Sequence, residues 1–210
     1  PLPHLDPPPN RLLLNGVPYT PQAPFGMDAA HEEYCEAAAL SMVEQYYSGD
    51  RRPIIPPQEA ETRMAQIVNF ERLTFPGVLN LSLQEISQIS LDLYHRPGHL
   101  EPANLPNVER ELTAGHLVII PLMTNGSPGD RKINSAYGAE NVYHVMLLIG
   151  FDQSAGPLIF TNDAGIRQGH GLAYSWATLN SAIEAMTRTT RDDSGITVPS
   201  EQGAQMLVFT

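Results

Sequence analysis

Helical and extended patterns of apolar residues follow one another along this chain, with helices prominent in the first half. From Cys35, apolar residues recur at steps of three and four as far as Tyr47, which predicts a helix with one buried face. The segment Ser48-Gly49-Asp50 ends it, because glycine readily adopts the left-handed conformation found after helices. Helical spacing also covers Pro57–Leu73, Asn107–Ala114 and Trp176–Arg188. A further helix is expected to begin at the capping box Ser82-Leu83-Gln84-Glu85 and to run to Leu93.

Continuous apolar runs in the second half have the length and composition of buried strands. They cover His116–Leu122, Tyr143–Phe151, Leu158–Asp163 and Met206–Phe209. Because helices come first and an antiparallel-looking set of strands follows, we expect an α+β fold. We expect loops over residues 96–106 and 124–142, both candidate walls of a cleft, since long loops in a compact domain are often functional.

Proline is concentrated at the start of the chain, with Pro1, Pro3 and Pro7-Pro8-Pro9. We interpret residues 1–16 as a proline-rich extended arm, of which Leu12-Leu13-Leu14 could dock on the core. Residues 17–210 are expected to form a single domain. Its helical half would span residues 27–115 and its sheet half residues 116–210.

Composition narrows the classes of function. The chain has 210 residues, 42% of them hydrophobic, which suffices for a substantial core, and a formal net charge of −11. That charge disfavours binding of phosphate groups, so nucleic acid is not an expected partner. A single cysteine excludes an internal disulfide and a multi-cysteine metal site. No apolar run is long enough to span a membrane. No signal peptide is recognisable, and because the sequence begins at Pro1 rather than Met, we expect a processed or trimmed chain.

The single cysteine, Cys35, lies at the predicted start of a helix. There the helix dipole and the unpaired backbone N–H groups favour a thiolate, the form that a nucleophilic cysteine needs. The alternative is that Cys35 is a small, buried and inert apolar residue.

The predicted hairpin brings an imidazole and a carboxylate to one face of the sheet. If Phe151 pairs with Leu158, His144 is diagonal to Asp163, and in a tighter register the two are directly opposite. A one-residue slip or a bulge would present Asn162 instead. Either side chain could accept a hydrogen bond from Nδ1 of His144, which would give the base and the orienting group that a cysteine nucleophile requires.

Several segments together resemble one protein family, in its order along the chain. They are Gln22 within Pro21-Gln22-Ala23-Pro24-Phe25, Cys35-Glu36-Ala37-Ala38-Ala39-Leu40, Ala114–Ile119, Tyr143–Asp152 and Thr161-Asn162-Asp163. The chain resembles, from about Val17 to Ala185, the bacterial cysteine peptidases related to bacteriocin-processing double-glycine leader peptidases, family thirty-nine-like. The resemblance implies a papain-like fold, in which a helical part carrying the cysteine packs on an antiparallel sheet carrying the histidine and aspartate.

The resemblance also implies roles for four residues. Cys35 would be the nucleophile, His144 the general base and acid, and Asp163 the group that orients the imidazole. Gln22 would donate its amide to the oxyanion together with the backbone N–H of Cys35. It further implies a peptide or protein substrate, no cofactor, and export or attachment to the bacterial cell envelope.

Two positions depart from the family pattern. Glu36-Ala37 follows the cysteine where many relatives have glycine and proline, and Ala164 follows Asp163 where many have proline. A carboxylate beside the nucleophile disfavours the thiolate, so we expect Glu36 to point away from it, facing outward or making a structural contact. Two alternatives to a peptidase remain, a catalytically silent peptide-binding module and a transpeptidase or acyltransferase using the same triad.

Other polar and aromatic residues are weaker candidates. Asn162, Tyr143 and His170 could contact substrate, although a surface loop is the simpler interpretation of His170. Tyr174 and Trp176 are expected to pack on the last helix, and His31 is expected in a solvated turn. Pro97 and Gly98 break helical spacing between His95 and His99, so no metal site is expected there.

Overall fold

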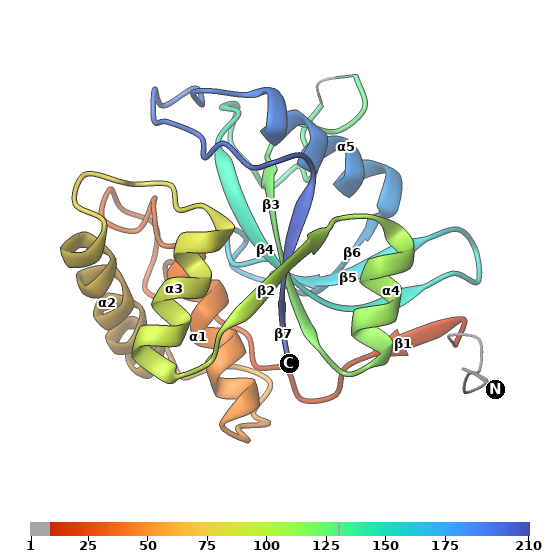
Figure 1. Ribbon diagram of the computed structural model, residues 1–210, viewed down its shortest axis with the longest axis horizontal. Coiled ribbons are helices and arrows are strands. Elements are labelled where there is room, and N and C mark those ends of the chain that lie inside the picture. The colour runs from red at the N-terminus through yellow and green to blue at the C-terminus, as the bar shows by residue number, and fades with distance from the viewer. Residues whose placement is uncertain (1–8, 130) are drawn as a thin grey trace.

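The computed structural model describes residues 9–129 and 131–210, in which five helices accompany a seven-stranded sheet (Figure 1). The helices are α1 (Cys35–Tyr47), α2 (Pro57–Thr74), α3 (Leu83–Tyr94), α4 (Leu105–Thr113) and α5 (Trp176–Arg188). The strands are β1 (Arg11–Leu13), β2 (Gly98–Pro102), β3 (Leu117–Met123), β4 (Tyr143–Asp152), β5 (Leu158–Asn162), β6 (His170–Ser175) and β7 (Gln205–Phe209). The strand order is β2-β7-β3-β4-β5-β6, with β1 paired to β4, and all these pairs are antiparallel.

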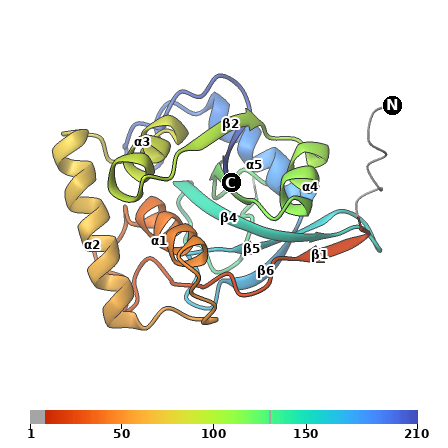
Figure 2. The ribbon, with the colours of Figure 1, turned by 60° about the horizontal axis from the view of Figure 1, so that its bottom comes forward.

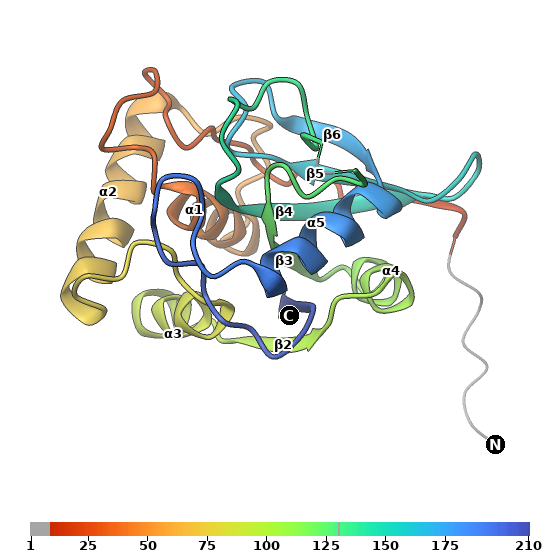
Figure 3. The same ribbon diagram turned by 90° about the horizontal axis from the view of Figure 1, so that it is seen from above.

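Helices cover both faces of the sheet, α1, α2 and α3 on one side and α4 and α5 on the other (Figures 1 and 3). Strand β4 lies between the two layers. Its odd-numbered residues, such as Val145 and Leu147, belong to the core with α1, whereas Met146 and Leu148 belong to the core with α5. Because successive side chains of a strand point to opposite faces, a strand covered on both sides reads as a continuous apolar run.

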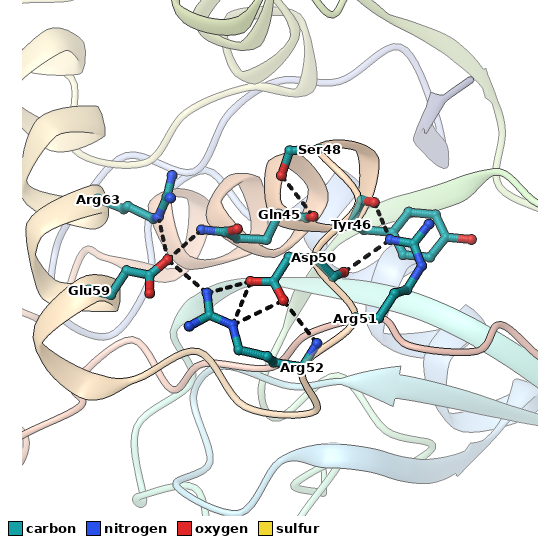
Figure 4. Close-up of polar contacts among 8 residues, drawn as sticks. All are labelled: Gln45, Tyr46, Ser48, Asp50, Arg51, Arg52, Glu59 and Arg63. Atoms are coloured by element: carbon teal, nitrogen blue, oxygen red, sulfur yellow. Dashed lines mark hydrogen bonds and ion pairs between the residues drawn. The ribbon is translucent and has the colours of Figure 1, made fainter.

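Helix α1 is buried over most of its length and brings its N-terminal residue, Cys35, to the sheet. Ala37, Ala38 and Ala39 have no exposed surface, and such small side chains allow close packing. Polar contacts join the end of α1 to α2 (Figure 4): Arg52 binds Asp50 and Glu59, and Glu59 also accepts from Gln45 and Arg63. Arg52, Glu59 and Arg63 are partly exposed, so their ion pairs orient the connection and add little stability.

The predicted helices and strands are present, and most of their ends lie within two residues of the predicted ones. The capping box forms as expected, with Ser82 accepting from Glu85 N and the Glu85 side chain accepting from Ser82 N. Two strands were not predicted. β2 lies within the predicted loop 96–106 and β6 includes His170, so the loop interpretation of both segments is wrong. Both strands are at sheet edges and are half-exposed, which leaves little apolar pattern to detect.

The N-terminal segment is also part of the sheet (Figure 2). Residues 1–8 of the predicted arm lie outside the described residues, but Leu12 and Leu14 pack on the core and β1 pairs with the far end of β4. Gly150 permits this approach, because a Cβ atom there would lie 2.4 Å from the carbonyl oxygen of Leu12. None of the described helices has the length and apolar character needed to cross a bilayer.

Candidate active site

Cys35 is the first residue of α1, and its thiol has an unexpected partner. The Sγ atom donates to Oε2 of Glu36 at 3.0 Å, and Oε1 of Glu36 accepts from the backbone N–H of Leu81 at 3.0 Å. Both side chains are buried. Glu36 therefore does not face outward or point away from the thiol, as was expected, but the alternative expectation of a structural contact is confirmed. The carboxylate turns inward because it makes the structural contact to Leu81, at the segment that leads into α3.

This environment keeps the thiol protonated. Burial raises the pKa of Cys35 well above its usual value, and the hydrogen bond and charge of Glu36 and the charge of Glu33 raise it further. The backbone N–H of Val145, the residue after His144, acts in the opposite direction but does not offset them. The helix N-terminus alone therefore does not produce a thiolate here.

His144 and Asp163 form a buried pair, with Nε2 of His144 3.0 Å from Oδ1 of Asp163. The expectation that Nδ1 makes this contact is wrong. Because Nε2 faces the aspartate, Nδ1 is the nitrogen available to another partner. Among the hydrogen bonds of the described residues, none joins His144 to Cys35.

Two tyrosines complete the surroundings of Asp163. Tyr137 donates to Oδ1 and Tyr174 to Oδ2, each at 2.6 Å. Burial alone would raise the pKa of Asp163, but the hydrogen bond and charge of His144 and the two hydroxyl groups outweigh burial and lower it. Asp163 is therefore an ionised carboxylate at neutral pH, able to hold an imidazolium.

The hairpin register explains how the pair meets. Near the turn Phe151 pairs with Ile159, and a bulge between Leu148 and Gly150 then shifts the register so that Leu147 pairs with Asn162. The predicted pairing of Phe151 with Leu158 is therefore wrong, since Leu158 pairs with Asp152. His144 and Asp163 lie just beyond the last paired residues, Leu147 and Asn162, and their side chains meet there. A Cβ atom at Gly165 would lie 3.0 Å from Cε1 of His144, so glycine leaves room for the imidazole.

The turn that follows Asp163 is held by Tyr19. The Tyr19 hydroxyl donates to the carbonyl oxygens of Asp163 and Ile166 and accepts from Gly169 N. A Cβ atom at Gly169 would lie 1.9 Å from the Asp163 carbonyl oxygen, so only glycine fits there. The segment before α1 thus fixes the turn that presents the carboxylate.

Gln22 lies at the same site but its amide is already engaged. Nε2 donates to the carbonyl oxygens of His31 and Glu32 at 2.8 and 3.1 Å, in the segment just before Cys35. Its Oε1 is buried and accepts no hydrogen bond from the described residues. Both amide hydrogens are thus used in the free protein, and none is directed at a vacant position beside the thiol.

A pocket of about 430 Å³ opens beside the imidazole. Its wall includes Gln22, Tyr137, Tyr143, His144 and Gly165. The predicted loop 124–142 supplies much of this wall, as expected of a cleft wall. Segment 96–106 lines no part of this pocket among the described residues, because it contains the edge strand β2 on the far side of β7.

The weaker candidates have other environments. Tyr143 lines the pocket and donates to Leu81 O at 2.8 Å, whereas buried Asn162 donates to Pro18 O and accepts from Gly171 N. The exposed His170 stacks on Tyr19. His31 contacts Asp28 and Glu61 rather than solvent alone. In the described part of the chain, no group of three or more His, Cys, Asp or Glu side chains could hold a metal ion.

Three contributors to the site were missed in the sequence analysis. Tyr174 was expected only to pack on α5, Tyr137 was unmarked within a long loop, and Asp192 reaches the pocket from a polar stretch. One signal was available for Tyr174: a tyrosine eleven residues after Asp163 could return beside it on the next strand, if β6 had been recognised.

Comparison with known proteins assigns this chain to a family. The sequence model of the peptidase C39-like family matches residues 14–190, and no curated protein matches the chain. The crystal structure of a candidate C39-like peptidase from Bacillus anthracis shares the fold, with a TM-score of 0.59 and 14% sequence identity. The match covers 95% of this chain and 97% of that one. The fold is therefore α+β and papain-like, and the chain belongs to the peptidase C39-like family.

Proposed function

We propose that this protein is a cysteine peptidase that cleaves amide bonds through an acyl-enzyme intermediate. The observation that carries the proposal is the buried His144–Asp163 pair, 3.0 Å apart, at the wall of a pocket and next to the segment that contacts Cys35. Family membership supports a peptidase in general. The roles of the individual residues are our inference.

In the proposed reaction, Nδ1 of His144 takes the proton of the Cys35 thiol, and the sulfur attacks the substrate carbonyl carbon. The backbone N–H of Cys35, in the first turn of α1, and the amide of Gln22 would donate to the oxyanion. The imidazolium then gives its proton to the leaving amine as the C–N bond breaks. Water, deprotonated by the same imidazole, attacks the thioester and releases the acid and the free thiol.

Two contacts of the free protein must change for this reaction. The thiol proton now donated to Glu36 has to reach His144, which requires rotation of the Cys35 side chain. Gln22 has to release or share one of the two N–H groups that bind His31 O and Glu32 O. Binding of substrate in the pocket would supply the free energy for both changes.

One observation favours a second candidate, a peptide-binding module without turnover. The thiol is buried, protonated and hydrogen-bonded to a carboxylate, and such a cysteine is a poor nucleophile. A transpeptidase or acyltransferase would use the proposed chemistry with an amine in place of water.

Cleavage of a diverse peptide library, read by mass spectrometry, separates these candidates. We expect the wild type to cleave, Cys35→Ala and His144→Ala to be inactive, and Glu184→Gln, an exposed change on α5, to match the wild type. Because there is one cysteine, an acyl-enzyme would appear as a single mass adduct. Peptides that bind wild type and Cys35→Ala equally and are never cleaved would identify the binding module. Transfer of the acyl group to an added amine would identify the transferase.

A further inference from the structure

The pocket beside His144 is lined by acidic side chains from three separate segments. The acidic residues of its wall are Glu32, Glu33, Glu140 and Asp192. No Lys or Arg side chain belongs to this wall within the described part of the chain. The wall of the pocket therefore carries acidic side chains and no basic side chain to balance them.

Glu33 shows that these charges lack a counterion. Its half-buried carboxylate has no hydrogen bond or ion pair with the described residues. Burial, with the charges of Glu36, Asp192 and Glu32, raises the pKa of Glu33 to about 7. Each charge that acts on it is negative, so removal of water here is unfavourable unless a cation enters.

Gln22 gives independent evidence for a ligand that donates hydrogen bonds. This side chain is only 5% exposed, lines the pocket, and has a carbonyl oxygen, Oε1, without a partner among the described residues. In the free protein Nε2 faces the carbonyl oxygens of His31 and Glu32, which identifies Oε1 as the atom without a partner, and sharing one N–H with an oxyanion would keep this orientation. A buried acceptor without a donor costs free energy, and a donor-bearing ligand would remove that cost.

The spacing of the acidic groups favours an organic cation over a metal ion. They do not converge, since no group of three or more of the described His, Cys, Asp or Glu side chains could hold a metal. A volume of about 430 Å³ suits a side chain with several carbons. A guanidinium or ammonium group distributes its N–H donors over several acceptors, as this wall requires.

We propose that this pocket binds the side chain of a lysine or arginine residue of the peptide substrate, next to the bond that is cleaved. Cleavage next to the basic residue depends on the proposed peptidase function, whereas binding of the basic side chain depends on the pocket alone. Glu33 and Asp192 are the specificity-determining residues. Asp192 also accepts from Ile196 N through Oδ1, which leaves Oδ2 for the ligand.

The test uses matched peptides that differ at one residue beside the cleaved bond, with Lys, Arg, norleucine or Glu at that position. We expect wild type to prefer Lys or Arg over norleucine by at least about ten-fold in kcat/KM, because norleucine cannot make the charge-assisted hydrogen bonds that a basic side chain makes with the acidic wall. Glu33→Gln combined with Asp192→Asn should remove most of that preference. Both changes keep an acceptor oxygen, so the contact to Ile196 N is retained. Glu184→Gln is the matched control, since it removes one carboxylate away from the pocket.

A second measurement separates this inference from the proposed function. Binding of the same peptides, and of the free amines agmatine and spermidine, is measured on Cys35→Ala by calorimetry. Tighter binding of Lys and Arg peptides, lost in the double variant, supports the inference even if no peptide is cleaved. Cleavage or binding without preference for Lys or Arg overturns it and leaves the peptidase proposal intact. Tight binding of the free amines with no peptide preference identifies a small-amine site and also overturns it.

Discussion

The thiol of Cys35 donates to the carboxylate of Glu36 at 3.0 Å, and both side chains are buried. The cysteine that we propose as the nucleophile is thus paired with a neighbouring acid in a way that disfavours the thiolate. The carboxylate is held in place from its other side by Leu81 N. Burial is the main cause of the raised pKa of Cys35, and Glu36 adds to it through its charge and its hydrogen bond.

The first prediction concerns Glu36→Gln. This change removes the negative charge and allows the amide to donate to sulfur, so we expect the pKa of Cys35 to fall. The rate of iodoacetamide alkylation at pH 7 should rise at least about ten-fold, the effect of one pKa unit. The measurement is the alkylation rate against pH for wild type, Glu36→Gln and the distant control Glu184→Gln. A pH midpoint that does not move in Glu36→Gln would contradict the assigned role.

The second prediction uses two pocket glycines. A Cβ atom at Gly165 would lie 3.0 Å from both His144 Cε1 and the Tyr137 ring, whereas at Gly138 it would meet nothing within 4 Å. We expect Gly165→Ala to displace the imidazole and lower kcat/KM roughly ten- to hundred-fold. Gly138→Ala should retain activity. Thermal unfolding checks that both variants fold, and equal activity of the two would show that the imidazole tolerates the added methyl group.

The third prediction concerns Tyr174→Phe, which removes a 2.6 Å hydrogen bond to the ionised Asp163. We expect a loss of about 1–3 kcal/mol in the free energy of unfolding at pH 7. The folded-state pKa of Asp163 is depressed, so its stabilising contribution is present above 3.8, the usual value, and disappears as pH falls through the folded-state value. The deficit of the variant should shrink at lower pH accordingly.

Urea unfolding at pH 7 and at pH 3, which is below the usual pKa of 3.8, measures this deficit. Tyr143→Phe is the matched control, because it removes a 2.8 Å hydrogen bond to the neutral carbonyl of Leu81. Its deficit should not change with pH. If both deficits behave alike, the Tyr174 hydroxyl does not stabilise the charge on Asp163.

The fourth prediction is a dependence of stability on pH through Glu71. Burial, followed by the charge of Glu36, raises the pKa of Glu71 from 4.5 to about 8 despite the opposing charge of Arg72. Between these values the folded state holds a proton that the unfolded state releases, so stability falls as pH rises from 4.5 to 8.

Glu71→Gln should therefore lose less stability than wild type between pH 5 and pH 8. We expect a difference on the order of 1 kcal/mol or more, since each pKa unit is worth about 1.4 kcal/mol. The raised pKa of His31 adds a loss in the same direction, but it is common to both proteins and cancels. Parallel curves for the two proteins would show that Glu71 is ionised when folded.

Periodicity was sufficient to predict the elements that carry the site. Buried strand β4 and amphipathic helices are specified by local patterns, and the hairpin placed His144 beside Asp163 because strand residues alternate. The edge strands β2 and β6 could not be found in this way. Strand β2 pairs with β7, which is distant in the sequence, and both β2 and β6 are half-exposed. Pairing rather than composition therefore defines them.

Details of the site depended on contacts between distant segments. The inward turn of Glu36 is set by Leu81, forty-five residues away, and the choice of imidazole nitrogen follows from the position of Asp163 after the bulge. No local pattern contains this information. The acidic character of the pocket likewise arises because Glu33 and Asp192 meet only in the folded chain.

The turn held by Tyr19 has a consequence for the order in which the protein becomes competent. Cys35 precedes Gly169 in the chain, and the turn that carries Asp163, the proposed orienting carboxylate, is held only when Gly169 N donates to the Tyr19 hydroxyl. A nascent chain that ends before Gly169 contains Cys35 but lacks the contact between Gly169 N and the Tyr19 hydroxyl that holds this turn. If the proposed mechanism holds, the site is assembled only after the segment that contains Gly169 has been synthesised.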